Sequence, residues 1–63
     1  MTNYTIDMRV RITPEAFTRS GEIGTLTYID PEQQNALVRF DDGEELGYLV
    51  DDGEIEEMTT PQP

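Results

Sequence analysis

Short runs in which apolar and polar residues alternate constrain the fold of this chain more than any other feature. In the run DMRVRIT, Met8, Val10 and Ile12 fall on one side and the intervening arginines on the other. A period of two is typical of a β-strand that buries one face. Five short strands with turn residues between them predict an all-β fold, a small closed or half-closed barrel of five strands. The four further segments expected to form strands are EIGTLTYID (22–30), ALVRF (36–40), EELGYLV (44–50) and EIEEM (54–58).

The segments between these strands are short and carry turn-forming residues. PEAFTRSG follows the first strand, and only its residues 14–19 have room for a helical turn. Gly24, inside the second strand, predicts a β-bulge. We expect a single domain over residues 1–58 with an N-terminal arm at 1–6, followed by a disordered tail at 59–63 in which prolines oppose strand formation. A domain of this size buries only about 60% of its unfolded surface, so its core is thin.

The sequence DDGE occurs twice, and its first copy determines how two strands pair. A two-residue Asp-Gly turn would place the apolar residues of the flanking strands on opposite faces of the sheet. A three-residue Asp-Asp-Gly loop instead pairs Val38 with Leu46 and keeps one common face apolar. The same register sets Arg39 opposite Glu45, and it places Gly43 where the loop needs a left-handed backbone. The first copy therefore predicts a hairpin loop.

The second DDGE, at residues 51–54, links the fourth strand to the last and predicts a tight turn. A calcium loop of the EF-hand type needs acids at alternate positions and a Glu six residues after its Gly, and neither copy has this spacing. These acids are also expected on exposed turns, where nothing desolvates a carboxyl group for acid–base catalysis. We therefore expect neither a metal site nor a catalytic pair of carboxylates.

The absence of cysteine and histidine removes much of the usual chemistry of small proteins. Disulfides, thiolate zinc sites and imidazole bases all need one of these residues. The longest apolar runs are of two or three residues, which predicts neither a signal peptide nor a membrane span. We expect a cytoplasmic protein that is not an enzyme, binds no cofactor and does not insert into a membrane.

Charge is distributed very unevenly along the chain. Residues 1–40 have a net charge of −1, whereas residues 41–63 hold nine acids and no base, and the whole chain has a formal net charge of −10. Such a surface repels phosphate backbones and attracts basic surfaces, but it would also serve to keep a small protein soluble and monomeric. Because like charges raise the pKa of a carboxyl group, the acids of the second half are expected to bind protons more readily in the folded chain.

The order of these segments resembles a known class of folds. MRVRI, a loop, SGEIGTLTYID, ALVRF and GYLV follow one another as in the SH3-like barrels, and the pattern is nearest to the PsaE-type barrel of photosystem I subunit IV. The glycine-rich part is also similar to the KOW motif of ribosomal and transcription proteins. The resemblance implies an SH3-like barrel over most of the chain. It implies no site residues, because SH3-like barrels host many unrelated functions.

An apolar patch is expected on the outer face of the barrel. Leu37 lies opposite Gly47 in the predicted hairpin, and Leu49 is its diagonal neighbour on the same face. A bulge near Tyr28 and Ile29 would turn Ile29 inward and Tyr28 outward beside Leu37. An apolar patch rimmed by acids is typical of a surface that binds another protein.

Two further features of the surface leave alternatives open. Tyr4 and Ile6 of the N-terminal arm would either fold over the apolar patch or leave it exposed. Arg9 and Arg11 would form a phosphate-binding stripe, or they would be neutralised by acids of the last strand, and we favour the second. Phe17 would reach a ligand from its loop or plug the mouth of the barrel, and again we favour the second.

These features favour a non-catalytic protein-binding module, monomeric when free, that docks on a basic surface of a larger protein as an accessory or regulatory subunit. A second hypothesis is a nucleic-acid mimic, of the kind that some viruses encode, whose carboxylates imitate phosphates and inhibit a DNA- or RNA-binding enzyme. A KOW-like module that itself binds nucleic acid is a third hypothesis, which the charge opposes. The residues expected to bind the partner are Tyr28, Leu37, Leu49, Asp41, Asp42, Glu44, Glu45, Asp51 and Asp52.

Overall fold

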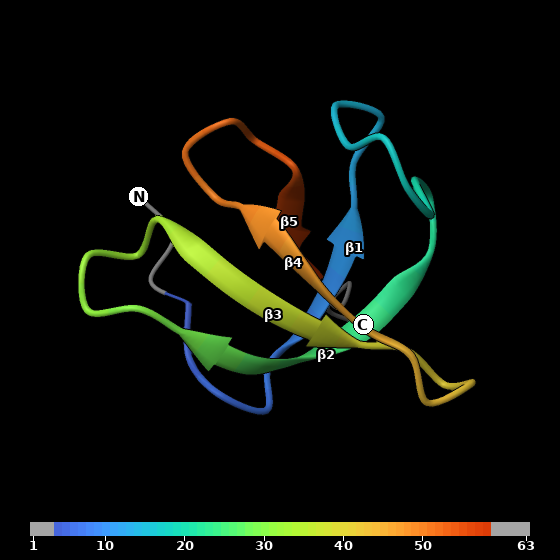
Figure 1. Ribbon diagram of the computed structural model, residues 1–63, viewed down its shortest axis with the longest axis horizontal. Helices are drawn as coiled ribbons and strands as arrows, with labels where there is room; N and C mark the ends of the chain where they lie inside the picture. Colours follow the sequence, from blue (N-terminus) through green and yellow to red (C-terminus); the bar gives the residue numbers. More distant parts are fainter. Residues whose placement is uncertain (1–3, 59–63) are drawn as a thin grey trace, which may run out of the picture.

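The computed structural model describes residues 4–58, and this part of the chain contains five strands and no helix (Figure 1). Residues 14–19 form turns and bends, so the helical turn that the sequence allowed there is not formed. The expected tail at 59–63 and the first three residues of the arm lie outside the described residues. The strands are β1 (Arg9–Ile12), β2 (Ile23–Ile29), β3 (Asn35–Arg39), β4 (Glu45–Leu49) and β5 (Ile55–Glu57).

The strands form one antiparallel sheet in the order β4-β3-β2-β1-β5 (Figure 1). β4 and β5 are its two edges, and no ladder joins them within residues 4–58, so the sheet is open. The turn that joins the two edge strands is held by a backbone hydrogen bond of 3.2 Å from the Glu54 N–H to the Leu49 carbonyl. The all-β prediction is therefore confirmed. Because the sheet is not closed, the predicted barrel is not confirmed.

The hairpin of β3 and β4 has the register that the sequence predicted. Val38 pairs with Leu46, and Arg39 pairs with Glu45. The loop closes through a hydrogen bond of 2.9 Å from the Gly43 N–H to the Phe40 carbonyl. Gly43 has a φ of 93°, in the left-handed region that glycine adopts without a steric penalty. The first DDG is thus a three-residue hairpin loop.

The bulge in β2 lies where the apolar patch required it, and not at Gly24. Gly24 pairs regularly with β1, and the register shifts between Leu26 and Tyr28, which turns Tyr28 outward. Gly24 is needed for a different reason. A Cβ atom at this position would lie 2.5 Å from Val38 Cγ1 and 2.8 Å from the Arg39 carbonyl oxygen. The glycine therefore permits close packing of the sheet on itself.

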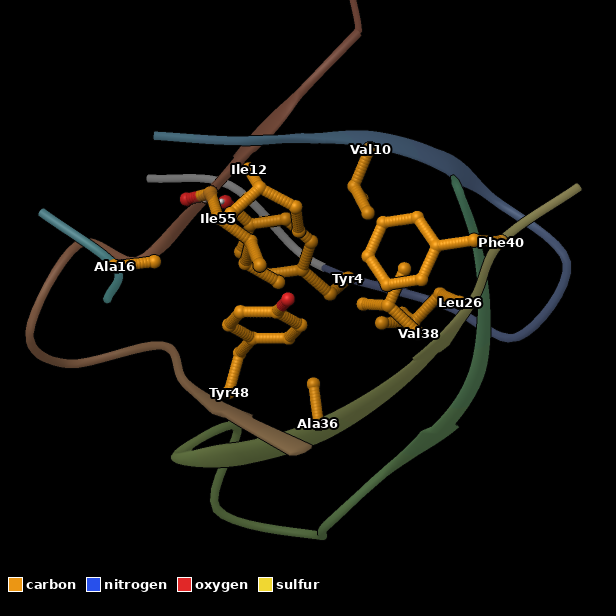
Figure 2. Close-up of a cluster of buried hydrophobic side chains, with 10 residues drawn as sticks. All are labelled: Tyr4, Val10, Ile12, Ala16, Leu26, Ala36, Val38, Phe40, Tyr48 and Ile55. Carbon is orange, nitrogen blue, oxygen red and sulfur yellow. Dashed lines mark hydrogen bonds between the residues drawn. The ribbon is translucent and has the colours of Figure 1, made fainter. Parts of the chain in front are cut away.

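The core is a single cluster on the concave side of the sheet (Figure 2). Tyr4 enters this cluster from the N-terminal arm, and its hydroxyl donates a hydrogen bond of 3.3 Å to the Ile55 carbonyl on the edge strand β5. The arm thus completes the core, and Ile6 remains half-exposed. The cluster consists of Tyr4, Val10, Ile12, Ala16, Leu26, Ala36, Val38, Phe40, Tyr48 and Ile55.

No segment of residues 4–58 forms a helix that is long and apolar enough to cross a membrane.

Candidate partner-binding surface

The three apolar residues predicted for the outer patch lie together and uncovered. Tyr28, Leu37 and Leu49 are 46%, 37% and 45% exposed. Together with Gly47 they line a surface hollow of about 280 Å³, which we call the outer hollow. Gly47 forms part of its floor, since a Cβ atom there would lie 3.6 Å from Leu37 Cδ2. Tyr4 is buried in the core instead, and neither Tyr4 nor Ile6 lines this hollow, so the alternative in which these two residues fold over the patch is wrong.

A second hollow, of about 210 Å³, lies beside the core-facing side chains of β4, and we call it the inner hollow. Phe17 lies at its rim and is fully exposed, so the prediction that this ring plugs the interior is wrong. Tyr48 occupies the interior instead, because its hydroxyl donates a hydrogen bond of 3.0 Å to the Thr18 carbonyl. Burial raises the pKa of Tyr48. The inner hollow is lined by Phe17, Thr18, Leu46, Gly47, Tyr48 and Glu54.

The acidic hairpin loop is neutralised by an arginine that the sequence did not mark. Arg19, from the loop between β1 and β2, lies 2.8 Å from Glu22, 2.9 Å from Asp42 and 2.5 Å from Glu44. Its guanidinium group also stacks over the ring of Phe40, 4.1 Å from the centroid. Only 17% of the Arg19 side chain is exposed. This arginine therefore joins the hairpin loop to the β1–β2 loop and to the core.

The Arg19 cluster corrects the expected electrostatics of the acidic half. The hydrogen bonds that Arg19 donates to Glu22 and Asp42 raise the pKa of Arg19, so the guanidinium is firmly charged. The hydrogen bond from Arg19 in turn lowers the pKa of Asp42. The sequence predicted a raised pKa for these carboxyl groups, and for Asp42 this is wrong because the fold supplies a cation from outside the acidic segment.

The two arginines of β1 also form ion pairs, but with acids from different parts of the chain. Arg11 lies 3.5 Å from Glu56 on β5, as the neutralisation hypothesis predicted. Arg9 lies beyond the last residue pair of the β1–β5 ladder and instead approaches Asp41 at 3.8 Å. Both pairs are about half-exposed or more, and ion pairs of that kind contribute little to stability.

The remaining predicted acids lie outside these ion pairs, although Arg39 stands opposite Glu45 in the β3–β4 ladder. Glu45 accepts a hydrogen bond from the Thr27 hydroxyl, and Asp51 and Asp52 project from the exposed turn between β4 and β5. None of these three acids forms an ion pair with a residue between 4 and 58. Among the same residues, no group of three or more acids is arranged to hold a metal ion.

The structure thus divides the predicted surface into three parts. The apolar patch lines the outer hollow and has Glu45 on the same face of β4. The loop at 41–44 is tied to Arg19 and Arg9, whereas the turn at 51–52 has no ion-pair partner within the described part of the chain. Sequence reasoning missed Arg19 because it counted charge along the chain. The one local signal for its role was an acid, Glu22, three residues after it.

Comparisons with known proteins add no family to this description. No protein-family model matches the sequence, and no curated protein or solved structure matches it.

Proposed function

We propose that this chain is a small, acidic, non-catalytic protein-binding module with an SH3-like barrel architecture. In this proposal it acts in the cytoplasm as an accessory or regulatory subunit and docks on a basic surface of a larger protein. The architecture is supported by the sequential order of β1 to β4 in the sheet and by the pairing of β5 with β1. In this architecture β4 and β5 curve around the core as the two unpaired edges of a partly open barrel.

The observation that carries the proposal is an uncovered apolar hollow next to uncompensated acids. Tyr28, Leu37 and Leu49 line the hollow, and the chain leads from Leu49 directly into the turn that bears Asp51 and Asp52. Apolar contact supplies affinity in protein interfaces, whereas charge at the rim supplies attraction at a distance and selects the partner. A basic protein surface with a protruding apolar side chain fits both features.

The ion pairs weaken the two hypotheses that involve nucleic acid. A mimic needs a regular array of free anionic groups, but Asp41, Asp42, Glu44 and Glu56 all lie within ion-pair distance of arginines. A nucleic-acid-binding module needs free cations, and three of the four arginines are the partners in these pairs. Docking on protein is the function that remains best supported.

The test is affinity capture from the native host with four forms of the full chain, followed by mass spectrometry. The wild type is compared with Leu37→Ser/Leu49→Ser, which removes the patch, and with Asp51→Asn/Asp52→Asn, which removes the bare charges. Glu15→Gln/Glu32→Gln is the matched control, because it removes two exposed acids elsewhere. Thermal melts establish that each form is folded.

We expect one protein to be captured by the wild type and the control and to be lost from both surface variants. High salt should release it, because the attraction is between opposite charges. Capture that is abolished by added DNA or RNA would favour the mimic instead. Equal capture by all four forms would contradict docking through this surface.

A further inference from the structure

The edge of β4 presents backbone groups to solvent in a fixed alternation. In the hairpin, the Phe40 N–H donates to the Glu44 carbonyl and the Val50 N–H donates to the Gln34 carbonyl, both at 2.8 Å. Residues of β4 therefore bond to β3 at the even-numbered positions. At the odd-numbered positions, which are Glu45, Gly47 and Leu49, the N–H and C=O groups point away from β3 toward the open edge.

One end of this edge is already capped by the chain itself. The Leu49 N–H donates to the Glu54 carboxylate at 2.7 Å, and the Leu49 carbonyl accepts from the Glu54 N–H at 3.2 Å. At the opposite edge of the sheet, the Ile55 carbonyl accepts from the Tyr4 hydroxyl. No residue between 4 and 58 caps the outward groups of Glu45 and Gly47 in this way. We call these uncapped groups of Glu45 and Gly47 the open window; it offers two N–H donors and two C=O acceptors.

Both hollows adjoin this window. Gly47 and Tyr48 belong to the lining of the outer hollow and also to that of the inner hollow. A strand that pairs with β4 directs successive side chains to opposite faces of the sheet. One side chain of such a strand would enter the outer hollow beside Leu37, and its neighbours would enter the inner hollow beside Leu46 and Phe17.

We propose that an extended segment of the partner protein adds to the edge of β4 as a sixth strand, with apolar residues at its centre and basic residues at its ends. This inference rests on the proposed function and names the form that the docking takes. The centre must be apolar because it lies between the two hollows. The ends must be basic because Glu45, Glu54 and the bare turn at 51–52 surround the window.

Charge argues against a second copy of this chain as the occupant. Two copies would each bring a formal net charge of −10, and pairing through β4 would place Glu45 of both copies near the same interface. A charged residue on a short edge strand is a common protection against such self-pairing. A basic strand meets no such repulsion.

The test uses a synthetic peptide, acetyl-RKVIVKR-amide, and the uniformly ¹⁵N-labelled full chain. Two N-methylated forms of the peptide serve as matched probes. One is methylated on both valine amides, and the other on the isoleucine amide and on the amide of the lysine that follows the second valine. In a strand that pairs with β4, only one of these two sets of amides faces β4, whereas both forms carry the same charge and the same number of methyl groups.

We expect the unmethylated peptide to slow amide hydrogen exchange at Glu45 and Gly47 by about tenfold or more. One methylated form should bind about tenfold more weakly, which corresponds to the loss of two backbone hydrogen bonds, and the other should bind like the parent. Gly47→Val should also weaken binding, because it fills the outer hollow but keeps the backbone N–H. Thr5→Val, at an exposed position of the arm, is its control and should bind normally.

Three results would overturn strand addition. The first is equal binding of both methylated forms, with salt-sensitive changes in amide chemical shift confined to Asp51 and Asp52. This result would support docking by charge and contradict the pairing of a strand with β4. Protection of Glu45 and Gly47 that grows with protein concentration and needs no peptide would assign the edge to a second copy. If none of the three peptides binds, strand addition is contradicted. The proposed function is decided independently by the capture experiment with the wild type and its variants.

Discussion

The two DDGE turns have the same sequence and a similar local backbone but opposite electrostatic environments. In each, the glycine N–H bonds back to the residue three positions earlier, from Gly43 to Phe40 and from Gly53 to Val50, both at 2.9 Å. Each glycine has a positive φ, of 93° and 75°. Asp42 in the first turn is bonded to Arg19, whereas Asp52 in the second has no cation within the described structure.

The difference shows which property is local and which is not. The turn itself follows from Asp-Asp-Gly, because the glycine tolerates the left-handed backbone wherever the segment stands. The charge state of the turn depends on what the fold brings beside it. Arg19 is more than twenty positions away from Asp42 in the sequence, and it converts the first acidic turn into a structural contact. In the second turn, Asp52 forms no ion pair with a residue between 4 and 58.

The largest effect is expected from Arg19→Gln, which would make the first turn resemble the second. This change leaves Glu22, Asp42 and Glu44 close together without a cation, and it uncovers the ring of Phe40. The melting temperature at pH 7 should fall further than for any other substitution proposed for the turns. Arg39→Gln is the control, because Arg39 forms no ion pair with a residue in the described part of the chain. Similar melting temperatures for the two variants would contradict a structural role for the Arg19 cluster.

The glycines of the two turns should respond alike. Gly43→Ala and Gly53→Ala each place a Cβ atom on a residue with positive φ, although neither Cβ would meet another atom within 4 Å. The cost is therefore conformational, about 1 kcal/mol in the free energy of unfolding for each. Urea denaturation would measure both values. A much larger loss at one glycine than at the other would mean that the two turns differ in backbone strain as well as in charge.

Substitutions of the two central aspartates, Asp42 and Asp52, should affect stability differently, unlike substitutions of the two glycines. Asp42→Asn removes a bond to Arg19 and should lower the melting temperature at pH 7, whereas Asp52→Asn should not lower it. The pKa of Asp42 is lowered in the folded chain, so its stabilisation is present above its unfolded pKa of about 3.9 and is lost as the pH falls through the folded value. Between pH 5 and pH 2, the melting temperature of Asp42→Asn should therefore fall less steeply than that of the wild type. Parallel acid curves would show that Asp42 contributes nothing through its charge.

The contrast also explains which parts of the molecule the sequence could predict. The hairpin register followed from parity, because only a three-residue loop puts Val38 and Leu46 on one face. The outward orientation of the apolar patch followed from the same register together with the bulge before Tyr28. Both depend on neighbours along the chain or across one ladder, where periodicity is informative.

The incorrect predictions, the alternative left open for Tyr4 and the missed role of Arg19 all depend on contacts between segments that are far apart. The residues next to each of these positions in the sequence do not show that a side chain at position 24 would clash with Val38, that Tyr4 enters the core, or that Phe17 stays in solvent. Arg19 belongs to the same class, since its partners come from two loops. A thin core also leaves room for such exchanges, because an arm residue can fill a place that a loop residue was expected to fill.

The smallest effect concerns salt, and it tests whether the bare turn is the part that repels. Excess negative charge destabilises the compact chain, so added sodium chloride should raise the melting temperature of the wild type at pH 7. In Asp51→Asn/Asp52→Asn the rise should be smaller, because two unpaired charges are gone. In Asp42→Asn/Glu44→Gln it should be equal or larger, because salt then has fewer favourable ion pairs to weaken while the bare turn still repels. Both variants remove two acids from turns of the same sequence, so net charge alone would change their salt responses identically. A divergence between them separates acids that hold the fold from acids that are free to attract a partner, and an identical response would assign the effect to net charge and leave the two turns electrostatically equivalent.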